Sequence, residues 1–327
     1  MKNEKLITLL HYIIRTIILL ALSVYIAYLV ETGSLQLYIG ERIMPLVKLS
    51  ALVVYALAVI QGFIAYRSYK GAIIECDCCG SSPSNSWPKA SFLYGVIALP
   101  LLLGFFLPDT VLGGSFASKK GIILSSSASP YAALGFQPQQ NEAAFDPSDA
   151  QWAPPSSNDT EETGETDSST SAESLDQLFY ADNDFDRDLA ELAKRIYKLP
   201  MIEVKPEIYM EILSSIVTFK EHFIGKSIEI SGFVYREPDL ADDQLVIGRI
   251  AVQCCTADAT PYGVLAEFVG ASELKDDTWV KVKGTIGETE YNGNTIIKID
   301  VAESSMINVP DPPYIYPNFD FLNVSIP

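Results

Sequence analysis

The chain of 327 residues combines a mean hydropathy of +0.18 with a formal net charge of -18, and neither property is spread evenly. Residues 121–186 hold thirteen acidic residues and no lysine or arginine, whereas apolar residues concentrate before residue 107. Nucleic-acid binders need a cationic surface to neutralise phosphates, so this balance excludes a nucleic-acid partner. The five cysteines form two clusters and are too few for a disulfide scaffold.

Three apolar runs predict a transmembrane domain over residues 1–110. They cover approximately residues 6–30, 44–66 and 91–107, and about twenty apolar residues in a helix cross a hydrocarbon core of about 30 Å. The third run contains Pro100, which membrane helices tolerate when neighbouring groups satisfy the freed carbonyl. We therefore expect a multi-pass protein of the cell membrane, in contact with lipid and anchored by three transmembrane helices.

Charged residues beside these runs predict the topology, because lysine and arginine accumulate in cytoplasmic loops. The basic residues on one side are Lys2, Lys5, Arg67, Lys70 and Lys89, against Glu31, Glu41 and Arg42 on the other. This pattern predicts a cytoplasmic N-terminus and, after three crossings, an extracytoplasmic C-terminal domain. Lys119 and Lys120 oppose it, since they add positive charge to the predicted outer side.

Three polar residues, Arg15, Lys48 and Gln61, lie within the apolar runs. An arginine near the bilayer centre costs roughly 2.5–3.5 kcal/mol on insertion scales, so Arg15 is expected to snorkel or to face another helix. Polar groups in lipid need hydrogen-bond partners. We therefore expect these three side chains to contact a partner protein in the membrane.

Residues 111–174 are predicted to form a disordered acidic linker. The segment is rich in serine, proline and acidic residues, and it has too little apolar surface to offset the entropy of ordering. A soluble domain over residues 175–327 follows. Its first elements are predicted helices over 184–199, where acids lead and bases trail, and over 206–223, where Pro206 suits the first turn.

From residue 227 the hydrophobic period changes to two, which is typical of strands. The predicted strands are 227–237, 245–255, 263–269, 279–291 and 294–309, and the Asn292-Gly293 pair between the last two predicts a hairpin. Glycines at Gly232, Gly248 and Gly284 suit the sharp bends of a small barrel. We expect a soluble α+β domain with an OB-like small β-barrel; an open sandwich is the competing fold.

The first cysteine cluster, Cys76, Cys78 and Cys79, lies between the second and third apolar runs. Three thiolates within four residues offer soft ligands for a metal such as zinc or monovalent copper. Acylation of membrane-proximal cysteines, or no role at all, are the alternative interpretations.

The second cluster, Cys254 and Cys255, precedes a turn-rich stretch that contains Asp258. Adjacent side chains of a regular strand point to opposite faces, so joint ligation requires the backbone to leave strand geometry there. A disulfide between neighbours is strained. A redox or metal site that includes Asp258 and an ordinary pair of one core and one edge cysteine both remain open.

An enzyme is not expected. The sequence contains no Ser-His-Asp set, no Walker loop and no dinucleotide fingerprint, and its two histidines, His11 and His222, offer little for a histidine-based hydrolase.

The string GRIAVQCCTADATPYGVLAEF, with GKSIEISGFVYRE before it and WVKVKGTI after it, resembles the bacterial DUF1980 family of YcgQ-type two-component permease subunits. In that family a membrane-anchored protein with an extracytoplasmic C-terminal domain is encoded beside a multi-spanning permease. The resemblance implies the same partner here, and the acidic linker looks like an addition to the family pattern. The residues that carry the most distinctive part of the match are Arg249, Cys254, Cys255, Asp258, Ala259, Tyr262 and Gly263.

The leading hypothesis is a non-catalytic accessory subunit of a membrane permease. Its outer β domain is expected to bind a ligand or a metal ion such as zinc or copper, with Cys254, Cys255, Asp258, Arg249 and Tyr262 as the candidate residues. The alternative is an envelope thiol-redox or metal sensor that uses Cys254 and Cys255. A third interpretation is a structural module of the cell surface.

Overall fold

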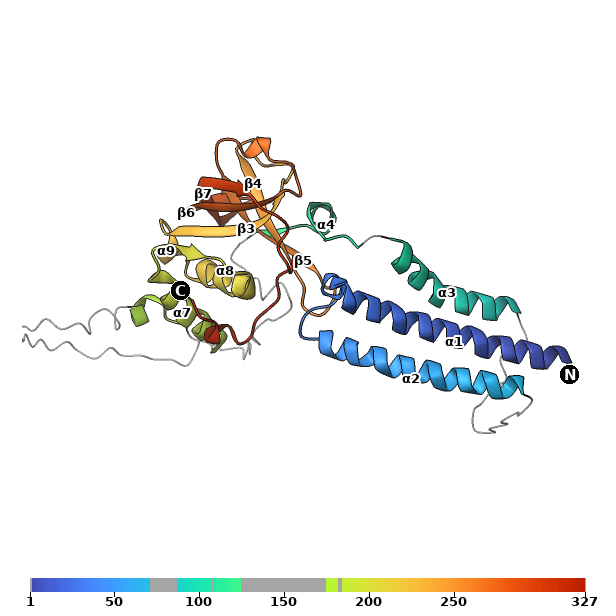
Figure 1. Cartoon of the computed structure of the whole chain (residues 1–327). Helices are drawn as coiled ribbons and strands as arrows, with labels where there is room; N and C mark the ends of the chain where they lie inside the picture. The colour runs from blue at the N-terminus through green and yellow to red at the C-terminus, as the bar shows by residue number, and fades with distance from the viewer. Residues whose placement is uncertain (1, 71–86, 108, 125–174, 182–183, 327) are drawn as a thin grey trace, which may run out of the picture. The chain divides into compact units, whose positions relative to one another are not determined.

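The computed structural model describes residues 2–70, 87–107, 109–124, 175–181 and 184–326 (Figure 1). The chain divides into two compact units. The first comprises Met1–Val111 and the loop Val252–Ala259, and the second comprises Leu112–Ala251 and Thr260–Pro327. The cysteines Cys76, Cys78 and Cys79 lie outside the described residues, so the hypotheses for that cluster stay predictions.

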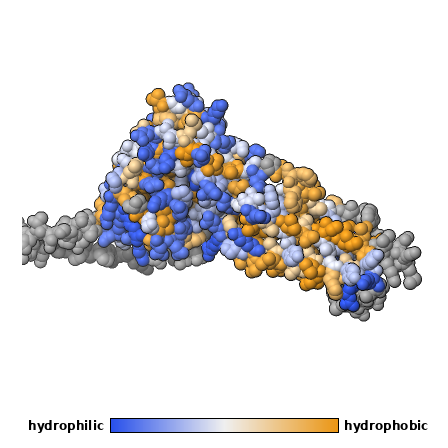
Figure 2. Space-filling model, in the orientation of Figure 1, coloured by the Kyte–Doolittle hydropathy of each residue, from blue (hydrophilic) through white to orange (hydrophobic). Residues whose placement is uncertain are grey.

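Three long helices build the first unit: α1 (Lys2–Glu31), α2 (Met44–Tyr69) and α3 (Trp87–Phe106), with a short 3₁₀ turn η1 (Ser34–Leu37) after α1. Two helical segments are long and apolar enough to cross a membrane, Leu9–Glu31 and Met44–Tyr69, whereas the apolar part of α3 is shorter, Phe92–Phe106. Apolar side chains cover much of the visible face of these helices (Figure 2). Two candidate spans are therefore present, and a third crossing by α3 stays a prediction.

Helices α1 and α2 pack closely because small residues line the seam between them. Ala51, Ala58 and Ala65 of α2 are buried at intervals of seven residues. The Ser23 hydroxyl of α1 donates a 3.1 Å hydrogen bond to the carbonyl of Ala51. A Cβ at Gly62 would lie 3.4 Å from a methyl group of Thr16. Small residues at such a seam let two apolar helices approach closely, which is how membrane helices associate.

Helix α3 contacts α1 through polar and aromatic groups. The Tyr94 hydroxyl lies 3.1 Å from His11 Nδ1, and Arg15 Nε donates a 3.1 Å hydrogen bond to the same hydroxyl. Further along, Gly104 leaves room for Tyr25, whose hydroxyl would lie 2.6 Å from an added Cβ. Arg15 therefore faces another helix of its own chain, which is one of the two arrangements that the sequence predicts for it.

The second unit is built on the predicted strands, all of which the structure contains. They are β3 (Ser227–Tyr235), β4 (Gln244–Ala251), β5 (Thr260–Glu267), β6 (Trp279–Tyr291) and β7 (Asn294–Met306), joined by two short strands that the sequence analysis missed, β1 (Ile123–Leu124) and β2 (Ile202–Glu203). Both short strands pair in parallel, β1 with β5 and β2 with β3. The hairpin prediction is confirmed, since Asn292 and Gly293 adopt φ of 51° and 76° between the paired residues Tyr291 and Asn294.

The strand pairing follows the path β5-β4-β3-β6-β7, and a parallel pairing of β5 with β7 joins the two ends of that path. Within β6 and β7 the register shifts at Lys283/Gly284. Such a bulge bends a strand and increases its local twist.

Gly284 is required at this bend because a neighbouring backbone fills the space of a side chain. A Cβ there would lie 2.3 Å from the carbonyl oxygen of Asp300. We expect Gly284→Ala to lower the free energy of unfolding by about 1–3 kcal/mol, as overpacking of a core does. The matched control is Gly287→Ala in the same strand, whose Cβ would have side-chain atoms of Asp300 and Lys298, not backbone, as its nearest neighbours. Urea unfolding of both variants tests this, and equal stabilities would contradict it.

Helices α7 (Asp184–Tyr197), α8 (Tyr209–Thr218) and α9 (Lys220–Phe223) precede the sheet, and the 3₁₀ turn η2 (Pro206–Ile208) leads into α8. The predicted helix over 206–223 is therefore divided, because Phe219 leaves helical geometry with φ of -116° and ψ of 34°. In α7, Leu189, Leu192, Ala193 and Ile196 are fully buried, which is the spacing of one helical face.

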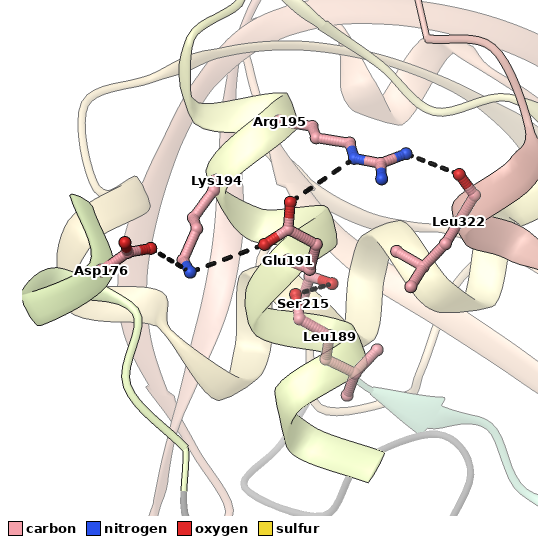
Figure 3. A network of polar contacts seen from close by, with 7 residues as sticks. All are labelled: Asp176, Leu189, Glu191, Lys194, Arg195, Ser215 and Leu322. Carbon is pink, nitrogen blue, oxygen red and sulfur yellow. Dashed lines mark hydrogen bonds and ion pairs between the residues drawn. The ribbon is translucent and has the colours of Figure 1, made fainter. Parts of the chain in front are cut away.

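Polar contacts fix α7 from its solvent side (Figure 3). Lys194 forms an ion pair with Asp176 and lies 3.6 Å from Glu191. Arg195 donates a 2.6 Å hydrogen bond to the carbonyl of Leu322 in the 3₁₀ turn η4 (Phe321–Asn323). Exposed ion pairs of this kind contribute only about 0–1 kcal/mol each, so the buried face provides most of the stability.

Ordered structure extends into the segment that the sequence assigned to the linker. Helix α4 (Gly114–Lys120) and strand β1 both lie within residues 111–174. The amide of Gly114 donates a short hydrogen bond of 2.5 Å to Asp277, and the amide of Leu112 donates one of 3.0 Å to the hydroxyl of Tyr314. Tertiary hydrogen bonds, the pairing of β1 with β5 and the burial of Ala117 and Leu124 therefore order this part of residues 111–174.

Candidate metal centre

Cys254, Cys255 and Asp258 come together in the loop between β4 and β5. Strand β4 ends at Ala251 and β5 begins at Thr260, so the adjacent cysteines lie outside regular strand geometry. Their sulfur atoms are 3.7 Å apart as free thiols. The two sulfurs and a carboxylate oxygen of Asp258 all lie within 4.8 Å of one another. The backbone thus meets the condition that joint ligation of one ion requires.

Asp258 organises this loop through its carboxylate. Its Oδ1 accepts a 2.8 Å hydrogen bond from the amide of Gln253, and its Oδ2 accepts bonds of 2.8 Å and 3.1 Å from the amides of Cys254 and Cys255. Three backbone donors on one carboxylate hold both cysteines at fixed positions around it. The same residue therefore shapes the loop and presents an oxygen ligand.

The cluster also sets the protonation of its members. The hydrogen bond to Asp258, followed by the neighbouring thiol of Cys255, raises the pKa of Cys254 to about 12. Burial acts to raise the pKa of Asp258, but hydrogen bonds from Cys254 and the backbone amides outweigh it and lower the pKa. At neutral pH the cluster therefore pairs an ionised carboxylate with a protonated Cys254. A protonated thiol is a weak nucleophile, whereas a metal ion displaces the proton on binding.

The connection between α1 and α2 holds the cysteine loop in place. The amide of Gly40 donates a 2.9 Å hydrogen bond to the carbonyl of Cys254, and the amide of Thr256 donates one of 2.9 Å to the carbonyl of Tyr38. Ile39 and Cys255 form an antiparallel bridge. Gly40 is suited to this position, since a Cβ there would lie 2.9 Å from the carbonyl oxygen of Gln253. The cysteine loop is therefore bonded to the residues that join two candidate membrane spans.

Tyr38 adds a side-chain contact within the same unit. Its hydroxyl donates a 2.5 Å hydrogen bond to Asp109, and this bond, with burial and the charge of Asp109, raises the pKa of Tyr38. Residues 38–40 were not singled out in the sequence. Nothing in their local pattern shows that they pair with a loop more than two hundred residues away.

Arg249 and Tyr262, the other ligand candidates, belong to the second unit and are not members of the cysteine cluster. They lie opposite each other in the register of β4 and β5. Arg249 is fully buried, with its Cζ 5.0 Å from the centre of the Trp279 ring and 5.8 Å from that of Tyr209. Their role as ligand residues stays a prediction.

Two residues predicted as partner contacts, Lys48 and Gln61, lie on α2, where Lys48 is exposed and Gln61 is half-buried. Their role as partner contacts stays a prediction. Glu211, which no sequence pattern singled out, is fully buried in the first turn of α8. Every residue from Tyr209 to Val217 is buried. Apolar residues on both sides of the helix, such as Met210 and Leu213, were the sequence signal that could have indicated the burial of Glu211.

Comparisons with known proteins match both units of the chain. The DUF1980 N-terminal domain matches residues 14–123 and the DUF1980 C-terminal domain matches residues 179–317, so the acidic segment lies between the matched ranges. The UPF0703 protein YcgQ of Bacillus subtilis (strain 168) is 24% identical over 319 residues, which cover 93% of this chain and 99% of that protein. A protein of Streptococcus mutans serotype c named "Putative two-component membrane permease complex subunit" is 23% identical over 292 residues, covering 88% of this chain and 93% of that protein. No solved structure matches the chain.

Proposed function

The chain belongs to the DUF1980 family, and we propose that it is a non-catalytic accessory subunit of a two-component membrane permease. The name of the Streptococcus mutans relative supports a partner in the membrane. In this proposal α1, α2 and α3 all cross the bilayer, the N-terminus is cytoplasmic, and the sheet-rich unit is extracytoplasmic. Its multi-spanning partner forms the transport path, since three helices alone make a poor pore.

The second part of the proposal is that the loop between β4 and β5 is a metal centre. We infer that Cys254, Cys255 and Asp258 bind a soft or borderline cation such as zinc or monovalent copper, because thiolates are its preferred ligands. Three protein ligands leave one tetrahedral position for water or for a group from the partner. The observation that carries the proposal is the convergence of the three ligand atoms within 4.8 Å in a loop bonded to the α1–α2 connection.

An OB-like barrel is the fold that we propose for the sheet. The support is the pairing path itself, in which β5 pairs with β7 after the path has passed through β4, β3 and β6. This strand order agrees with a small barrel of the OB type and does not agree with an open sandwich, whose two sheets would have unpaired edges.

A thiol-redox sensor is the second candidate function, and the 3.7 Å separation of the two sulfurs favours it. The raised pKa of Cys254 opposes it, because the thiolate is the species that exchanges with disulfides. Purification of the full chain under oxygen, followed by thiol counting and metal analysis of the same sample, separates the two functions. We expect bound metal with both thiols retained; a Cys254–Cys255 disulfide without metal would favour the sensor.

Partner binding is tested with Arg15. Affinity purification of the full chain from its own membranes should recover one multi-spanning protein, and Arg15→Leu should reduce that recovery at least several-fold if the guanidinium also contacts the partner. The matched control is Tyr94→Phe, which removes the acceptor of the Arg15 hydrogen bond within the chain. Equal losses in both variants would show that Arg15 serves only the packing of α3 on α1. Full recovery with Arg15→Leu would contradict the proposed contact.

A further inference from the structure

A second group of polar side chains, in the core of the sheet-rich unit, has no role in the metal centre. It consists of Arg249 near the end of β4 and Tyr209, the first residue of α8, which are 0% and 2% exposed. The ring of Trp279, the first residue of β6, lies beside the guanidinium with 5.0 Å between Cζ and the ring centre. Three elements that are distant in sequence thus meet at one charged group.

The polar atoms of this group lack acceptors. Among the described residues, Arg249 Nε, Nη1 and Nη2 and the Tyr209 hydroxyl have no hydrogen-bond partner. Charged side chains are almost never fully buried unless they are paired. The faces of Trp279 and Tyr209 offset part of the charge by cation–π attraction, but they accept none of the N–H hydrogen bonds in the guanidinium plane.

The hydrogen-bond donors of Arg249 and Tyr209 that lack partners indicate which kind of ligand would satisfy them. Arginine is a donor only, and its planar fork matches the two oxygens of a carboxylate. The Tyr209 hydroxyl supplies one further donor, and the rings of Trp279 and Tyr209 lie beside the guanidinium. A single negative charge would balance the single guanidinium, whereas a dianion would leave an uncompensated buried charge.

We propose that Arg249 and Tyr209 form a buried binding site for a small monocarboxylate. Arg249 holds the two carboxylate oxygens through its fork, Tyr209 donates to one of them, and Trp279 closes the site against the guanidinium face. The inference does not depend on the metal centre or on the permease partner, because it uses neither the cysteine loop nor the membrane helices. Burial of Arg249 lowers its pKa in the absence of a ligand, which agrees with an electrostatic need for an anion.

Thermal unfolding of the full chain in detergent, followed by circular dichroism, tests the proposal with formate as the probe and chloride at equal ionic strength as the reference. Formate should raise the midpoint of the sheet-rich unit by roughly 5–10 °C at a hundred times its dissociation constant. Absence of a formate effect would mean that water satisfies Arg249 and would overturn the proposal. A larger effect of sulfate than of formate would overturn the monocarboxylate class.

Two variants and one control test whether formate binds at Arg249 and Tyr209. Arg249→Met should abolish the formate-dependent rise, and Tyr209→Phe should weaken formate binding in isothermal titration by about ten-fold or more, since one hydrogen bond to a charged group is lost. If Arg249→Met does not fold, Tyr209→Phe still decides the question. The control is Tyr314→Phe: Tyr314 is equally buried, but its hydroxyl accepts a hydrogen bond from the amide of Leu112. This control should lower the midpoint without changing the formate effect, and the same formate effect in all three variants would overturn the site.

Discussion

Replacement of both Cys254 and Cys255 by serine is expected to lower the affinity of the full chain for zinc or monovalent copper by more than about a hundred-fold. Loss of groups that only support a ligand already lowers metal affinity by about 10–100-fold, and this variant loses two of the three ligands themselves. Competition with a chromogenic chelator measures the affinity. Unchanged affinity in the double variant would remove the proposed centre.

The matched control for the cysteine variant is a triple serine variant of Cys76, Cys78 and Cys79. It has the same kind of substitution at the other cluster, so it should leave the high-affinity site intact. Loss of binding in the triple variant alone would assign the metal to the other cluster.

Asp258→Asn separates metal ligation from thiol reactivity, because it should change the two properties in opposite directions. Without the carboxylate, the pKa of Cys254 falls from its raised value of about 12, so alkylation of that thiol near pH 8 should become faster. Metal affinity should fall, since one ligand is lost. Alkylation rates at several pH values and the chelator competition test the two effects, and slower alkylation in the variant would contradict this account of the thiol.

Metal affinity should also increase with pH. A metal ion binds the thiolate and releases the proton of Cys254, whose pKa lies far above neutrality. Each released thiol proton makes the apparent affinity rise about ten-fold per pH unit. Chelator competition at pH 6, 7 and 8 measures the slope, and a flat profile would exclude thiolate ligation.

The second large effect concerns Glu211 and the pH dependence of folding. Its carboxyl group is fully buried, and its Oε1 accepts a 2.7 Å hydrogen bond from the amide of Asn318. Burial raises the pKa of Glu211 to about 8, from the ordinary 4.5 of an exposed glutamate. The unfolded chain ionises this group at the lower value, so its contribution to stability is fully present below about pH 4.5 and is lost as pH rises through 8.

We therefore expect the free energy of unfolding of the sheet-rich unit to fall by roughly 3–5 kcal/mol between about pH 5 and pH 9 because of this one group. Glu211→Gln should remove that fall, since the amide keeps the acceptor and never ionises. Glu207→Gln, at an exposed position in the preceding turn, is the control and should leave the profile unchanged. Urea unfolding of the wild type and both variants across this pH range measures the free energy of unfolding. An equal fall with pH in the wild type and in Glu211→Gln would contradict the assignment of the pH dependence to Glu211.

Most helices and strands of this protein follow from local patterns in its sequence. Apolar runs of membrane length, a change of hydrophobic period from helix to strand at residue 227, and an Asn-Gly hairpin signal are local patterns, and local patterns predict local structure. Helices α1, α2, α3 and α7 and all five long strands lie where those patterns indicated. The family resemblance likewise depended on a contiguous string of residues, and the comparisons confirm it.

Contacts between residues far apart in the chain depend on how the elements pack, which no local pattern indicates. The backbone bonds between residues 38–40 and the cysteine loop, the pairing of β5 with β7, and the ordering of α4 all join segments far apart in the chain. Burial has the same origin: Arg249 and Glu211 are polar residues in otherwise apolar segments, and only the packing of other elements around them removes both from water. The free energy of a buried charge depends on its whole surroundings, which no local pattern encodes.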